Sequence, residues 1–128
     1  MRIEDQRPLA VLDVALSVCK LRSADGVVLC RPFGCLTATE DEWSLVCPDA
    51  DVPGDALEVE RGFCALKVCG ALDFSLVGII ARIAGVLAAR GIAVFVVSTF
   101  DTDYVLIKRA RLEDAIEALE AGGYEIEA

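Results

Sequence analysis

The sequence contains no histidine, and this absence excludes several kinds of site. Serine and cysteine hydrolases of the triad type need a histidine base, and many metal sites need histidine ligands. No CxxC pair occurs among the cysteines, so zinc-ribbon and thioredoxin motifs are not expected. The glycine-rich phosphate-binding patterns GxGxxG and GxxxxGK are also missing. The sequence therefore indicates neither histidine-dependent catalysis nor a nucleotide-binding loop.

Basic residues are few: the chain has 12 lysines and arginines and 21 acidic residues, and the net charge is −9. An acidic surface repels phosphate groups, so we expect no nucleic-acid or membrane partner. The longest apolar stretches are divided by Arg82 and Arg90, and each falls short of the roughly 20 residues of a membrane span. The N-terminal segment lacks the apolar core of a signal peptide, so a cytoplasmic location is expected.

Apolar residues are abundant, at 55% of 128 residues, so most segments should be buried on at least one face. A chain of this length forms one domain or two very small ones. The six cysteines mostly lie inside apolar stretches, and we expect reduced core residues, with a redox or metal role as the alternative. They are Cys19, Cys30, Cys35, Cys47, Cys64 and Cys69.

The second half of the chain is predicted to follow a β-α-β-β-α-β order, the ferredoxin-like α+β arrangement of an antiparallel sheet with two helices on one face. Ile92 to Val97 is almost wholly apolar, which is typical of a central strand covered on both faces. The other predicted elements are strands at Phe63 to Cys69, Tyr104 to Lys108 and Tyr124 to Ile126, and helices at Ser75 to Arg90 and Leu112 to Ala121.

The predicted helix from Ser75 to Arg90 has two distinct faces. Asp73 or Ser75 can cap its start, and Gly91 ends it. Its apolar stripe, at three- and four-residue spacing, comprises Leu76, Ile79, Ile80, Ile83, Val86 and Leu87. Its small residues, which would allow close packing on a sheet or a partner helix, are Gly78, Ala81, Gly85 and Ala88. In the later helix, Leu112, Ile116 and Leu119 are expected to face inward, and Glu113, Glu117 and Glu120 outward.

The first half is less regular, and we interpret it as a reduced copy of the same arrangement. The predicted domains are a tail at 1–8, a reduced N-terminal unit at 9–60 and a complete unit at 61–128. The acidic run from Glu40 to Glu60, which includes a connection at Pro48 to Asp55, is expected to be a solvated surface, and a basic partner is the alternative. Strands are expected at Leu12 to Leu21, Gly26 to Arg31 and Leu57 to Val59, with a hairpin of Phe33 to Thr39 and Glu42 to Cys47.

The run from Ala71 to Ile126 resembles the ACT domain, a small ligand-binding module attached to enzymes of amino-acid metabolism. Its most specific pieces are LDFSL at residues 72–76, Gly78-Ile79 and STFDTDY at residues 98–104. It looks most like small bacterial proteins with tandem ACT units, which are related to the regulatory part of aspartate kinases and to the arginine sensors of animal nutrient signalling. The resemblance covers about residues 61–126.

The resemblance implies a free amino acid, or a similar metabolite, bound at an interface between ACT units. The ligand usually meets the loop between the first strand and the first helix, which here runs from Gly70 to Leu76 and includes Asp73, Phe74, Ser75 and Leu76. In the arginine sensors the segment similar to STFDTD contributes ligand contacts, which points to Thr99, Phe100 and Asp103.

The chemistry of these residues suits a zwitterion. A helix N-terminus offers unpaired N–H groups and partial positive charge to a carboxylate, and the segment from Asp73 to Ser75 leads into one. Asp101 and Asp103 can bind an ammonium or a guanidinium, and Phe100 can contact the side chain. Structural alternatives stay open: the aspartates can stabilise a turn or hold a divalent cation, and Phe100 can belong to the core.

Three functions follow from this reading of the sequence. The first is a non-catalytic amino-acid sensor without a cofactor, in which the ligand alters homodimer assembly or a partner protein. The second is a ligand-free interaction module. The third, an enzyme, lacks support because no acid–base or nucleophile pair is organised in the sequence. Trp43 lies in a predicted strand and is more typical of a core residue than of a binding platform.

Overall fold

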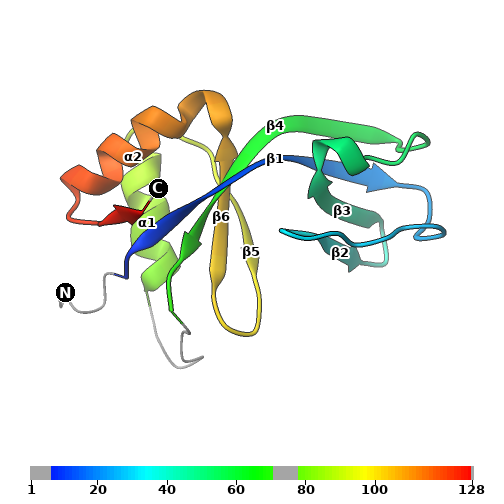
Figure 1. Ribbon diagram of the computed structural model, residues 1–128, viewed down its shortest axis with the longest axis horizontal. Coiled ribbons are helices and arrows are strands. Elements are labelled where there is room, and N and C mark those ends of the chain that lie inside the picture. The colour runs from blue at the N-terminus through cyan, green and yellow to red at the C-terminus, as the bar shows by residue number, and fades with distance from the viewer. Residues whose placement is uncertain (1–6, 71–77, 128) are drawn as a thin grey trace. The chain divides into compact units, whose positions relative to one another are not determined.

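A computed structural model describes residues 7–70 and 78–127 (Figure 1). Contacts divide the chain into two compact units. We refer to residues 1–13 and 64–128 as the helical unit and to residues 14–63 as the strand unit. Each unit has a hydrophobic cluster of its own.

Two long strands take part in both units. Strand β1 (Leu9–Leu21) begins in the helical unit and ends in the strand unit, and β4 (Glu58–Val68) runs from the strand unit into the helical unit. The structural units therefore differ from the predicted domains at 9–60 and 61–128, whose limits stay a prediction. The difference arises because the first residues of β1 pair with strands that come much later in the sequence.

The helical unit has the predicted α+β arrangement. Its strands lie in the order β7-β1-β4-β6-β5, with β5 antiparallel to β6 and β7 parallel to β1. The backbone N–H of Cys69 donates to the carbonyl of Pro8 at 2.9 Å, which joins the chain near the ends of β4 and β1. The elements that follow β4 are α1 (Ile79–Ala88), β5 (Phe95–Ser98), β6 (Asp103–Lys108), η3 (Arg109–Arg111), α2 (Leu112–Ala121) and β7 (Ile126–Glu127).

The core of this unit lies between one face of the sheet and the two helices. Alternate residues of a strand point to the same face, and three of β4 and two of β6 join the cluster in this way. The helices cover that face, as predicted. The cluster comprises Leu9, Cys64, Leu66, Val68, Ile79, Ile83, Leu87, Ile92, Val105, Ile107, Ala115, Leu119 and Tyr124.

Both helices end at a glycine in the left-handed conformation. Gly91, with φ of 72°, donates its N–H to the carbonyl of Ala88, and Ile92 donates to the carbonyl of Leu87. This pair of hydrogen bonds is the Schellman motif, which satisfies carbonyls that a helix end leaves unpaired. Helix α2 ends in the same way at Gly123, with φ of 95°. The predicted helix stop at Gly91 is confirmed.

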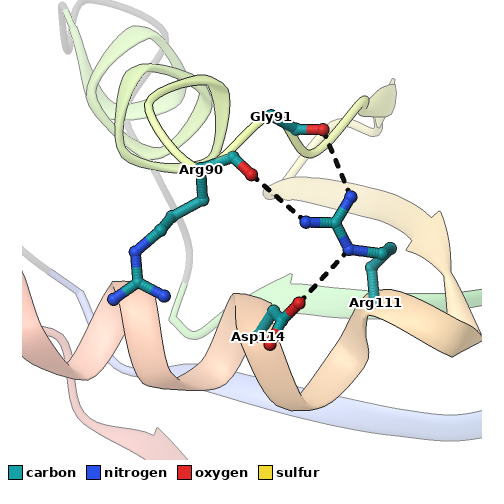
Figure 2. A network of polar contacts seen from close by, with 4 residues as sticks. All are labelled: Arg90, Gly91, Arg111 and Asp114. Carbon is teal, nitrogen blue, oxygen red and sulfur yellow. Dashed lines mark hydrogen bonds and ion pairs between the residues drawn. The ribbon is translucent and has the colours of Figure 1, made fainter.

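Arg111 ties the end of α1 to the start of α2 (Figure 2). Its guanidinium donates to the carbonyl oxygens of Arg90 at 3.1 Å and Gly91 at 3.3 Å, and its Nε donates to the carboxylate of Asp114 at 3.4 Å. A cation at a helix C-terminus is favourable because the carbonyl ends carry partial negative charge. The carboxylate of Asp114 holds the guanidinium in the orientation that reaches α1.

The predicted start of the first helix is wrong by four residues. Helix α1 begins at Ile79 and not at Ser75, with Gly78 as N-cap at φ of 86° and no side-chain cap. The proposed caps Asp73 and Ser75 lie outside the described residues. A positive φ favours glycine, so Gly78 marks the helix start.

The faces of the helices differ in part from those predicted. In α1, Ile79, Ile83 and Leu87 are buried, and Ile80 and Val86 pack against the core, while Leu76 lies outside the described residues. The row of small residues is exposed and does not pack on the sheet. In α2 the inward face is formed by Ala115, Ala118 and Leu119, whereas Ile116 is only half-buried.

The prediction of a central strand at Ile92 to Val97 is wrong. Strand β5 covers only Phe95–Ser98 and lies at the edge of the helical unit's sheet. Phe95 and Val96 are 37% and 36% exposed, while Ile92 belongs to the core before the strand begins. The apolar composition predicted that both faces of this strand are covered, and the residues that the structure describes leave Phe95 and Val96 partly exposed. The last predicted strand is also displaced, because Tyr124 is a core residue and β7 begins at Ile126.

The strand unit contains β2 (Cys35–Ala38), β3 (Trp43–Pro48) and the 3-10 turn η2 (Asp49–Asp51). Its strands lie in the order β2-β3-β1-β4. The predicted hairpin is confirmed, because β2 pairs antiparallel with β3 and Ala38 lies opposite Trp43. Its core comprises Cys19, Leu21, Leu45 and Cys47.

Two predictions for the strand unit need correction. Gly26 to Arg31 forms a turn and irregular chain rather than a strand. Leu57 to Val59 and Phe63 to Cys69 are not separate strands, because β4 continues through Gly62, whose φ is 84°. A glycine in a strand typically marks a bend rather than an end. Residues 14–63, all of which the structure describes, contain no α-helix, and a reduced ACT copy here stays a prediction.

The six cysteines are free thiols. Cys19, Cys47 and Cys64 are buried, as expected of small core residues, and the other three are half-buried. Burial raises the pKa of all three buried thiols. Among the described residues, no helix has the length and hydrophobicity needed to cross a membrane.

Candidate functional site

The turn between β5 and β6 is closed by its own hydrogen bonds. The N–H of Thr99 donates to the carbonyl of Thr102 at 2.8 Å. The hydroxyl of Thr99 donates to the same carbonyl at 3.2 Å and accepts from the N–H of Thr102 at 3.4 Å. A side chain that satisfies the backbone in this way stabilises a turn. The segment predicted as part of a site is therefore a compact turn.

Thr102 anchors this turn to the neighbouring strand. Its side chain is 5% exposed, and its hydroxyl donates to the carbonyl of Val68 at 2.6 Å. A buried hydroxyl needs such a partner, since leaving it unpaired costs free energy. The bond fixes the turn against the end of β4.

A hollow of about 290 Å³ lies beside the turn. We refer to it as the turn hollow. Lys67 comes from β4 and Asp101 from the turn, so the hollow has one cationic and one anionic side chain. Two threonines, a tyrosine and a glycine supply the rest of the wall. The lining residues are Lys67, Gly70, Thr99, Asp101, Thr102 and Tyr104.

A second cation lies beside the turn hollow at Gly70. The Nη1 atom of Arg7 is 3.5 Å from the position that a Cβ on Gly70 would take, and Gly70 has φ of 82°. The Nε atom of Arg7 is buried and has no hydrogen-bond partner in the structure, which covers residues 7–70 and 78–127. A buried donor without a partner is unfavourable, so this cation is suited to an additional acceptor.

The structure brings only some of the predicted residues together. Thr99 and Asp101 line the turn hollow, whereas Phe100 and Asp103 do not. The carboxylate of Asp103 accepts a hydrogen bond from Ser98. Phe100 is 80% exposed, so its alternative assignment to the core is wrong. Four further predicted contacts lie outside the described residues: Asp73, Phe74, Ser75 and Leu76.

Sequence reasoning missed Arg7, Lys67, Thr102 and Tyr104, whereas Gly70 is the first residue of the predicted ligand loop. Lys67 offered a signal, because it is the only charged residue in the apolar stretch FCALKVC. Arg7 offered none, since it lies 60 residues earlier in the chain and reaches the site only through the pairing of β1 with β4. Such a contact depends on topology rather than on a local motif.

The alternative role of Asp101 and Asp103, as ligands of a divalent cation, would need further acidic, cysteine or histidine side chains nearby. In the part of the chain that the structure describes, no three histidine, cysteine or acidic side chains gather as a metal site would require. Hard cations take six or more oxygen ligands.

Solved structures similar to this chain come from several bacteria. Protein Atu0741 from Agrobacterium tumefaciens is 30% identical, with a TM-score of 0.83, and 94% of this chain aligns with 92% of that one. Protein VC0802 from Vibrio cholerae, described as a possible transport protein, is 19% identical, with a TM-score of 0.77 and coverage of 98% and 94%. The regulatory subunit of aspartate kinase from Thermus thermophilus, in ligand-free form, is 12% identical, with a TM-score of 0.61 and coverage of 91% and 97%.

The last two similarities concern the fold alone. No curated protein sequence matches this chain significantly. The family model for the ACT domain matches residues 58–121, half of the chain. ACT domains are regulatory modules that in general bind small molecules such as amino acids. The order of strands and helices, the turn between β5 and β6 and the match to the family model lead to one conclusion: the chain belongs to the ACT domain family.

Proposed function

We propose that this protein is a non-catalytic sensor of a free amino acid, which binds in the turn hollow and alters assembly or a partner interface. The observation that carries the proposal is the presence of Lys67 and Asp101 on the wall of one hollow in an ACT unit. A free amino acid has one carboxylate and one ammonium, so it needs both kinds of partner. The regulatory role of the family supports a protein without catalytic activity of its own.

Lys67 and Asp101 bind the two ends of the ligand in this proposal. Lys67 pairs with the carboxylate, and Arg7 beside Gly70 adds a second positive group. Asp101 pairs with the ammonium, and the ring of Tyr104 contacts the side chain. The turn is already held by Thr99 and Thr102, so little ordering free energy is spent on binding. The predicted loop contacts at residues 73–76 are part of the proposal.

A second copy of the chain would cover the open side of the ligand. Strand β5 ends where the turn begins, and its outer edge has no neighbouring strand among the described residues. Its apolar side chains Phe95 and Val96 are partly exposed, and an exposed apolar edge is suited to pairing with another strand. We therefore propose a homodimer that forms through β5.

Dimerisation and ligand binding would be coupled in this arrangement. A ligand that contacts both copies binds the dimer better than the monomer, so it shifts the population toward the dimer. By thermodynamic reciprocity the dimer binds the ligand more tightly. This coupling is how a binding event would become a signal to a partner protein.

The alternative function is a ligand-free oligomerisation module. The exposed apolar side chains of β5 favour it, because they support pairing without any metabolite. The two functions differ in how association responds to amino acids. A sensor associates more strongly when its ligand is present, whereas a ligand-free module associates equally with and without amino acids.

A thermal-shift screen of the twenty amino acids tests the proposal. We expect one of them, at millimolar concentration, to raise the melting temperature by a few degrees, because a ligand that binds only the folded state stabilises it. The variants Lys67→Ala and Asp101→Asn should lose the shift, whereas the exposed control Glu120→Gln on α2 should keep it. The proposal is wrong if no amino acid shifts the transition, or if the shift is the same in all four proteins.

A further inference from the structure

A second hollow, of about 310 Å³, lies in the strand unit, and the proposed function does not use it. We refer to it as the Trp43 hollow. It lies where β1 ends and where the turn between β2 and β3 begins. Leu21 is the residue opposite Trp43 in the β1–β3 pair, and the N–H of Leu57 donates to the carbonyl of Lys20 at 2.8 Å. These pairings bring three segments of the chain to one place.

The apolar residues that line this hollow are Trp43, Leu57 and Leu21. Trp43 is half-buried and packs against the strand unit's core, while another part of the residue lines the hollow. Leu57 is 44% exposed. An aromatic ring held by the core is a rigid surface for an apolar group, because little side-chain entropy is lost when something packs on it.

Charges of opposite sign also line the Trp43 hollow. Lys20 and Arg22 lie at the end of β1, and the β2–β3 turn contributes Glu40, Asp41 and Glu42. In the part of the chain that the structure describes, none of these five side chains forms an ion pair with another. Cationic and anionic side chains therefore line one hollow without being joined in ion pairs.

The acidic turn is held in a defined conformation. The hydroxyl of Thr39 accepts from the N–H groups of Asp41 at 3.2 Å and Glu42 at 3.1 Å, and it donates to the carbonyl of Glu42 at 3.3 Å. The N–H of Thr39 donates to the same carbonyl at 3.0 Å. The backbone that carries the carboxylates is therefore fixed before anything binds.

We propose that the Trp43 hollow binds a small zwitterion with an apolar side chain, such as a free apolar amino acid or a dipeptide. The carboxylate of the ligand pairs with Lys20 and Arg22, and its ammonium pairs with the carboxylates of the turn. Its apolar side chain packs on Trp43 and Leu57. This site is separate from the turn hollow and has its own residues.

Tryptophan fluorescence measures this binding directly, because Trp43 is the only tryptophan in the chain. Leucine and the dipeptide Leu-Leu are the zwitterionic probes, and the stronger of the two identifies the source. N-acetyl-leucine and leucine amide each lack one charge. We expect a saturable change in emission with a zwitterion and at least tenfold weaker binding of both blocked forms.

Two sets of variants separate this site from the turn hollow. The double substitution of Lys20→Gln with Arg22→Gln should weaken zwitterion binding about tenfold while the circular dichroism spectrum stays unchanged. Lys67→Ala and Asp101→Asn should leave the fluorescence titration as it is. The inference is overturned if no zwitterion gives a saturable change, if the blocked forms bind equally well, or if only the variants of the turn hollow abolish the signal.

Discussion

Cys47 illustrates how one buried side chain sets a pH dependence. It is 4% exposed, and burial, with smaller contributions from nearby Cys19, Asp51 and Asp49, raises its pKa from the ordinary value of 9.0 to about 12. The unfolded chain loses this proton near pH 9, whereas the folded protein keeps it. The contribution of Cys47 to stability is therefore fully present below pH 9 and is lost as the pH rises toward 12.

We expect the free energy of unfolding to fall by about 2 kcal/mol from pH 9 to about pH 10.5 through Cys47 alone. Urea denaturation of the wild type and of Cys47→Ala at both pH values measures this contribution as a difference of differences. Ser44 is half-buried on the same strand and has no thiol, and Ser44→Ala provides the control, which should show the wild-type pH dependence. An equal fall in the wild type and in Cys47→Ala would contradict the assignment.

Thr102 is a second residue whose effect can be measured. The substitution Thr102→Val removes the hydroxyl that donates to the carbonyl of Val68 and leaves that buried carbonyl with one partner fewer. We expect a loss of stability of about 1 to 3 kcal/mol in urea denaturation. Thr99→Val, at the exposed side of the same turn, should cost less, and a larger loss there would show that Thr102 is not the anchor.

Single residues were predicted from the sequence where a local pattern indicates a role. Thr99 and Asp101 belong to a turn with many polar residues, and both line the turn hollow. Lys67 and Arg7 come from distant segments that strand pairing brings near the turn, and the linear sequence does not show that pairing. Whether any of these residues contacts a ligand stays a prediction.

At the scale of elements, the two helix ends make a matched comparison. Gly91 and Gly123 have φ values of 72° and 95°, where a side chain is strained. We expect Gly91→Ala and Gly123→Ala each to cost about 1 kcal/mol of stability. Gly85 lies inside α1, and a Cβ there meets nothing within 4 Å, so Gly85→Ala should stabilise the protein by about 0.5 to 1 kcal/mol.

Thermal unfolding of the three variants under identical conditions measures these changes. If Gly85→Ala destabilised the protein as much as the two end variants, backbone conformation would not be the cause, and close packing of the small-residue face would explain the result better.

Elements were predicted well where local signals mark their ends. The predicted bounds of α2, Leu112 to Ala121, agree with the structure because two glycines follow it. The start of α1 was misplaced because Ser75 and Asp73 resemble caps, whereas Gly78 occupies the cap position. The place of β5 in the sheet could not be predicted, because apolar composition indicates burial without telling whether the same chain or a second copy covers the strand.

At the scale of the whole molecule, the exposed edge strand predicts concentration-dependent association. Val96 lies in β5 opposite Val105 of β6 and is 36% exposed. We expect Val96→Lys to weaken the dimer at least tenfold in sedimentation velocity, because a charge on an edge strand opposes pairing. Val28 is 76% exposed in the strand unit, and Val28→Lys is the control that should associate like the wild type. A monomeric wild type at every concentration would refute dimerisation through β5.

The family and the arrangement of the helical unit were predicted from the sequence, because the spacing of apolar residues and the STFDTDY segment are local and distinctive. The strand unit was predicted only in part, because β4 continues through Gly62 at positive φ, whereas the sequence on either side of this glycine predicted two short strands. Its lack of an α-helix leaves little amphipathic periodicity from which to infer a fold.

The course of β1 also limits how the protein can be dissected. Leu9 and Ala10 pair with Ile126 and Glu127, so a fragment trimmed to the family match at residues 58–121 would lose both partners of that pair. Such a fragment would expose strand edges without a pairing partner, and we expect it to aggregate when it is expressed by itself. A gene that encodes residues 64–128, then a flexible linker and then residues 1–13 would instead keep the helical unit complete.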